Sequence, residues 1–71
     1  MDQSQVEDVF VYHQASGEQA ERIANVRDAA RDLAHAILAE CPASADRTDA
    51  LRKVREALNT ATDSILLEGL I

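Results

Sequence analysis

The sequence is poor in the residues that hold small proteins together without a partner. It has 71 residues, a single cysteine at Cys41, and only two aromatic side chains, Phe10 and Tyr12. One cysteine excludes an intrachain disulfide, and the spacing of His13, His35 and Cys41 is not that of a metal site. Alanine supplies much of the 46% apolar content and buries little surface. Chains of this size then commonly depend on association, so we expect a homo-oligomer.

Basic residues are also scarce: 7 Lys and Arg stand against 13 Asp and Glu, which gives a net charge of −6. This balance disfavours binding to long nucleic acid or to an anionic membrane, although a few local arginines could still hold a small phosphate ligand. The opening "MDQSQVEDVF" lacks the basic and apolar regions of a signal peptide. No run of about 18 apolar residues could span a bilayer. We therefore expect a cytoplasmic protein.

The two glycines and one proline leave long segments uninterrupted. Ser16, followed three residues later by Gln19, fits a capping box. From there an apolar stripe steps by three and four residues, which predicts a helix over about 16–40. Its members are Ile23, Val26, Ala30, Leu33 and Ile37.

The stretch "CPAS" ends this pattern, because Pro42 disfavours helical geometry at Cys41. Ser44 is then a plausible N-cap for a second helix over about 44–68, with Gly69 near its end. The second stripe consists of Leu51, Val54, Leu58, Ala61 and Ile65.

A short connection makes two such helices antiparallel neighbours. The predicted fold is therefore all-α: one domain over residues 1–71, built as a two-helix hairpin with an N-terminal arm over 1–15. Two helices cannot bury both stripes completely. We interpret the stripes as core and subunit interface, and we expect the apolar C-terminal "LLEGLI" to pack on a neighbouring subunit.

The arm contains both aromatic residues within "FVYH". In an extended segment Phe10 and Tyr12 point to one side, and Val11 and His13 to the other. Phe10 suits an apolar anchor. Tyr12 could anchor the arm too, with its hydroxyl at the surface, or its ring could stack on a base.

Arg27 and Arg31 are one helical turn apart and adjoin the apolar stripe. Ion pairing on the helix surface is one interpretation, and Asp28 lies within reach of Arg31. Arg27 has no acidic residue three or four positions away, however. The other interpretation is that a guanidinium group binds phosphate.

Signatures of catalysis are missing. The sequence has no nucleophile motif, no glycine-rich phosphate loop and no metal-ligand cluster, and its acidic residues fall mostly on exposed helical positions. We therefore expect no enzyme activity, no catalytic residue and no cofactor.

Taken together, the motifs resemble the small phage-encoded anti-CBASS sponges that sequester cyclic oligonucleotides. The resemblance covers roughly Val9 to Leu58 and follows four motifs in order. They are the arm F-x-Y-H (Phe10, Tyr12, His13), then R-x-x-A-x-x-L-A (Arg27, Ala30, Leu33, Ala34), then C-P-x-S (Cys41, Pro42, Ser44), and then R-x-x-A-L-x-K (Arg47, Ala50, Leu51, Lys53).

The resemblance implies that the protein binds a cyclic second messenger without cleaving it. The CBASS effector protein that this messenger activates, and that kills the infected cell, would then remain inactive. The resemblance also implies a homo-oligomer, typically a hexamer, with ligand pockets between subunits. By position, Tyr12 matches the tyrosine that stacks on a base, and Arg27 matches a basic residue that contacts phosphate. The candidate ligand-binding residues are Tyr12, Arg27, Phe10, His13 and Arg31.

Two departures bear on the ligand. Many relatives carry a basic residue where this chain has Val9, and that residue is associated with cyclic trinucleotides. Cyclic dinucleotides such as 3′,3′-cGAMP are therefore the first expectation, and trinucleotides stay open. The run "NTATDS", residues 59–64, also differs from the family pattern and could change packing or a pocket wall.

The alternative function is a helical protein–protein interaction module without a nucleotide ligand. A third reading is a small enzyme that opens the ring.

Overall fold

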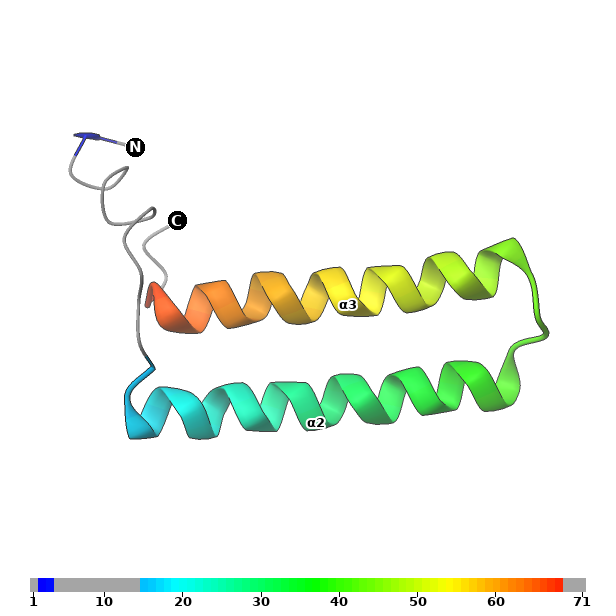
Figure 1. Ribbon diagram of the computed structural model, residues 1–71, viewed down its shortest axis with the longest axis horizontal. Helices are drawn as coiled ribbons and strands as arrows, with labels where there is room; N and C mark the ends of the chain where they lie inside the picture. Colours follow the sequence, from blue (N-terminus) through cyan, green and yellow to red (C-terminus); the bar gives the residue numbers. More distant parts are fainter. Residues whose placement is uncertain (1, 4–14, 69–71) are drawn as a thin grey trace.

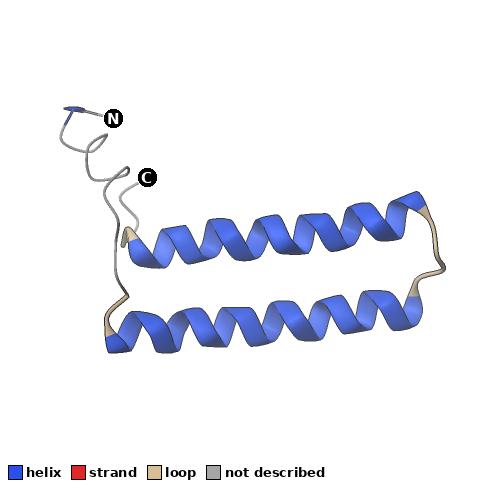
Figure 2. Cartoon of the chain, viewed as in Figure 1, coloured by secondary structure: helices blue, strands red, loops and turns tan. Residues whose placement is uncertain are grey.

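The computed structural model describes residues 2–3 and 15–68, and two antiparallel helices make up nearly all of this part (Figure 1). Helix α2 spans Gly17–Glu40 and helix α3 spans Ala45–Leu66, against expected ranges of about 16–40 and 44–68. Outside these two helices, Gln3 is also helical and the remaining described residues are loop or turn, and α2 and α3 lie side by side (Figure 2). The all-α hairpin predicted from the sequence is thus confirmed, whereas the arm residues 4–14 lie outside the described residues.

The start of α2 is the predicted capping box. Ser16 has extended backbone geometry, and its Oγ accepts a hydrogen bond from the Gln19 backbone N at 3.1 Å. In return, the Ser16 backbone N donates to Gln19 Oε1 at 3.1 Å. Two helix-end donors that would otherwise lack partners are satisfied in this way.

The connection between the helices is equally local in origin. Cys41, which precedes Pro42, is extended with φ −99° and ψ 135°, as expected for a residue before proline. Ser44 is the N-cap of α3, because its Oγ accepts a hydrogen bond from the Arg47 backbone N at 3.0 Å. Four residues, Cys41 to Ser44, therefore suffice to reverse the chain.

The end of α3 differs in one detail from the expectation of a glycine cap at Gly69. The helix ends at Leu66, and Glu68 adopts the left-handed φ of 47° that glycine usually supplies. A non-glycine residue pays a conformational penalty there. The Glu68 side chain also makes interactions with Gln19 and Arg22, which are described below.

The contact between the helices buries little. Within the described part of the chain only Ile23 and Ile65, with 7% and 8% of their surfaces exposed, are buried. The other members of the two stripes are half-buried, except Leu33, which is 53% exposed. Two helices form a single layer, and no second layer covers its faces. Most side chains of each stripe therefore lie between α2 and α3 but remain partly exposed.

Candidate functional site

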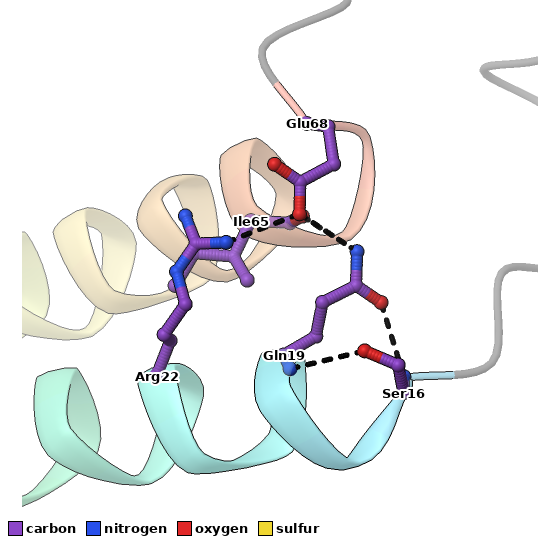
Figure 3. Close-up of polar contacts among 5 residues, drawn as sticks. All are labelled: Ser16, Gln19, Arg22, Ile65 and Glu68. Atoms are coloured by element: carbon purple, nitrogen blue, oxygen red, sulfur yellow. Dashed lines mark hydrogen bonds and ion pairs between the residues drawn. The ribbon is translucent and has the colours of Figure 1, made fainter.

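A cluster of polar contacts joins the N-terminal end of α2 to the C-terminal end of α3 and the turn after it (Figure 3). Gln19 Nε2 donates to the Ile65 carbonyl at 3.2 Å and to Glu68 Oε1 at 3.0 Å. Arg22 Nη1 donates to the same Glu68 oxygen at 3.1 Å. Because both side chains are charged, this contact is also an ion pair. We call these four residues, together with Ser16, the clasp.

The clasp has an electrostatic signature. Hydrogen bonding from Gln19, followed by the positive charge of Arg22, holds the pKa of the Glu68 carboxyl below its usual 4.5. The clasp fixes Ser16, the residue at which the arm joins the hairpin, beside the end of α3. The position from which the arm leaves the hairpin is therefore fixed relative to both helices.

A groove runs along one side of the seam between the helices. Its volume is about 280 Å³. Helix α2 contributes Arg27, Ala30, Arg31 and Ala34, and helix α3 contributes Leu51, Val54, Arg55 and Leu58. We call it the arginine groove. It combines a floor of aliphatic side chains with three guanidinium groups.

The three guanidinium groups of this groove have no ion-pair partner in the part of the chain that the structure describes. Among residues 2–3 and 15–68, the ion pairs join other residues: Arg22 with Glu68, and Lys53 Nζ with Asp49 Oδ2 at 2.8 Å. Neither Arg27, Arg31 nor Arg55 has a described carboxylate within ion-pairing distance. The pairing of Arg31 with Asp28 that the sequence allowed is therefore not formed.

Two of the five predicted ligand-binding residues, Arg27 and Arg31, lie together in the arginine groove. The other three, Phe10, Tyr12 and His13, lie outside the described residues. The structure thus places the two candidate phosphate-binding residues in a groove with an apolar floor. The role of the arm stays a prediction.

Arg55 was not among the predicted site residues, yet the sequence contains a signal for it. Arg27 directly follows the stripe residue Val26, and Arg55 directly follows the stripe residue Val54. In a helix the next residue lies about 100° further round. For two antiparallel helices that face each other, this turn carries both residues to the same side of the layer.

A second recess continues the arginine groove along α3. It is lined by Thr48, Leu51, Arg52 and Arg55 and has a volume of about 300 Å³. Arg55 and Leu51 belong to both depressions. The basic surface therefore extends from α2 across the seam and then along α3.

A second groove along the seam is lined by apolar residues alone. It has a volume of about 280 Å³ and is lined by Val26, Ala29, Ala30, Leu33, Val54, Ala57, Leu58 and Ala61. We call it the alanine groove. It has no charged side chain in its lining, and this distinguishes it from the arginine groove.

Two observations limit the kinds of site in the described residues. No group of three or more His, Cys, Asp and Glu side chains there is arranged to hold a metal ion. Neither described helix has the length and apolar character needed to cross a membrane.

Comparison with known proteins gives one match. Searches of curated proteins and of solved structures found no significant similarity. A family model described as the Acb2/Tad1 hairpin domain matches residues 2–65, which is most of the chain. The match includes the arm, both helices of the hairpin and the connection between them. The chain therefore belongs to the Acb2/Tad1 hairpin-domain family, the family of the anti-CBASS sponges.

Proposed function

We propose that this protein binds cyclic oligonucleotide second messengers and sequesters them without cleavage, so that the effector of a CBASS defence system is not activated. Membership of the Acb2/Tad1 hairpin family is the observation that carries the proposal. Cyclic dinucleotides such as 3′,3′-cGAMP are the first ligand class, and cyclic trinucleotides are the second. The protein would act in the cytoplasm of an infected bacterium.

The chemistry of the arginine groove supports this ligand class. A cyclic dinucleotide presents anionic phosphodiesters and planar bases. Arg27 and Arg31 offer guanidinium forks that hydrogen-bond phosphate oxygens, and the Ala30 and Ala34 methyl groups offer an apolar surface. These arginines have no carboxylate partner among the described residues, so phosphate would displace no ion pair of this part of the chain.

In this proposal Tyr12 stacks on a base and Arg27 contacts phosphate, with Phe10, His13 and Arg31 completing the site. No metal takes part, since the phosphodiesters are held and not attacked. The net charge of −6 repels longer nucleic acid, while a few arginines are enough for a small ring.

We also propose a homo-oligomer, a hexamer as the resemblance to the sponge family implies. The alanine groove supports this part. It presents small side chains that allow close approach of another helix, and Leu33 beside them is half exposed in the single chain. Burial of that face against a second copy would compensate for the small core.

Native mass spectrometry with a mixture of 3′,3′-cyclic dinucleotides and cyclic trinucleotides tests the function. We expect a discrete oligomer that carries intact rings, which can be recovered after denaturation and identified by mass. Tyr12→Ala and Arg27→Ala should each weaken binding. Recovery of a linear product would replace the sponge by an enzyme. An oligomer that binds none of the rings would point first to cyclic ADP-ribose-type ligands and then to a protein-interaction module.

A further inference from the structure

We infer that Arg55 of α3 is a phosphate-binding residue, and that it holds a second anionic group of the ligand opposite the one held by Arg27 and Arg31 of α2. The inference rests on the proposed function and adds a residue and a ligand property to it. The ligand would be a ring with at least two phosphodiesters, bound across the seam of the hairpin and not along one helix.

The first argument is the position of Arg55. Its side chain lines the same groove as those of Arg27 and Arg31, from the opposite helix. Ala30, Ala34 and Val54 line the same groove. A ligand lying on this aliphatic floor would have guanidinium groups at both edges, which suits an anion with two separated charges.

The second argument is the distribution of charge on this side of the hairpin. The ten residues that directly follow the members of the two stripes include four arginines and no acidic residue. They are Ala24, Arg27, Arg31, Ala34, Leu38, Arg52, Arg55, Asn59, Thr62 and Leu66. In a chain with 13 Asp and Glu against 7 Lys and Arg, such a segregation of positive charge is unlike a mixed solvated surface.

The third argument is that these arginines form no ion pair with any described residue. Arg22 and Lys53 both make ion pairs, with Glu68 and Asp49. Arg55 makes none with any described residue, although it is on the same helix as Lys53. Like charges near one another on a helix surface are unfavourable, so a group of arginines without a described ion-pair partner is better explained by a ligand than by stability.

The test compares Arg55→Gln with Lys53→Gln, measured by isothermal titration calorimetry with 3′,3′-cGAMP. The two changes remove the same charge from the same helix, but Lys53 lines neither the arginine groove nor the recess beside it. A hydrogen bond to a charged group is worth about 1.5–3 kcal/mol, so Arg55→Gln should weaken binding by about tenfold to a hundredfold. Lys53→Gln should leave the affinity within about twofold.

Arg55→Lys separates the guanidinium fork from the charge alone. It should bind between wild type and Arg55→Gln, because lysine keeps the charge but not the paired donors. Circular dichroism and the thermal midpoint of each variant check that the exposed substitution leaves the fold intact. Equal affinities for Arg55→Gln and Lys53→Gln, with wild type binding normally, would overturn this inference and leave the sponge function standing. A wild-type protein that binds no ring would overturn both.

The double variant Arg27→Gln/Arg55→Gln tests whether the two helices hold different phosphates. If they do, the losses in binding free energy should add, as they do for independent contacts. A double variant that binds no more weakly than either single variant would contradict the two-phosphate arrangement.

Discussion

The side-chain amide of Gln19 and the backbone carbonyl of Ile65 are joined across the open end of the hairpin, with Gln19 Nε2 donating at 3.2 Å (Figure 3). The two residues are 46 positions apart in the sequence. The same Gln19 amide closes the capping box of α2 and contacts Glu68. The Gln19 side chain therefore caps the start of α2 and also hydrogen-bonds the C-terminal end of α3.

Replacement of Gln19 by alanine should destabilise the hairpin. The change removes three hydrogen bonds, to the Ser16 backbone N, the Ile65 carbonyl and Glu68. Since the site is only partly buried, we expect a loss of about 1–2 kcal/mol in the free energy of unfolding. Urea unfolding at one fixed protein concentration measures it, because the stability of an oligomer depends on concentration. Gln3→Ala, at an exposed position outside the two helices, is the control, and an equal loss there would contradict the role of the clasp.

The contribution of Glu68 should depend on pH in one direction. Its folded-state pKa lies below 4.5, because Gln19 and Arg22 favour the ionised form. A lowered pKa means that the stabilisation is complete above the unfolded-state value and is lost as the pH falls through the folded-state value. The stability advantage of wild type over Glu68→Gln should therefore be constant near neutral pH and shrink below about pH 4.5.

Thermal unfolding of both proteins between pH 7 and pH 3 measures that difference. The Asp49 carboxyl also has a lowered pKa, caused by its hydrogen bond and charge interaction with Lys53. The comparison cancels this effect because both proteins retain Asp49 and Lys53. A difference that stayed the same down to pH 3 would show that Glu68 acts through its backbone geometry alone.

Gly17→Ala should stabilise the protein. Gly17 is the first residue of α2, and a Cβ placed there would meet no atom within 4 Å. Alanine restricts the unfolded chain and favours the helix, so the free energy of unfolding should rise by about 0.4–1 kcal/mol. Thermal or urea unfolding measures this rise. A fall in stability would indicate that the residues before Ser16 need the freedom of glycine at this point.

Leu33→Glu should disrupt assembly and not the fold of the chain. Leu33 is 53% exposed in the single chain and lies beside the alanines of the alanine groove. A carboxylate there would have to be desolvated if a second copy covers this face. Size-exclusion chromatography with light scattering should show a smaller species that is still helical by circular dichroism. His35→Glu, at an exposed position of the same helix that lines none of the three depressions, is the control and should keep the oligomer.

The sequence by itself determined the two helices, because the signals that start and stop them are local. Ser16 and Ser44 supply side-chain oxygens to nearby backbone N–H groups, and Pro42 excludes a helical Cys41. The apolar spacing fixed which side of each helix faces the other. Arg27 and Arg31 could be singled out in the same way, since they are neighbours on one helix.

Other features depended on the tertiary structure, since they join residues that are distant in the sequence. Nothing near Gln19 indicates that its amide reaches Ile65 and Glu68, and Glu68 takes a left-handed conformation where the sequence pointed to Gly69. Arg55 joins Arg27 and Arg31 only because α3 runs antiparallel to α2 in a defined register. The sequence determined which residues lie on each helix, and the packing of the two helices decided which of them share a groove.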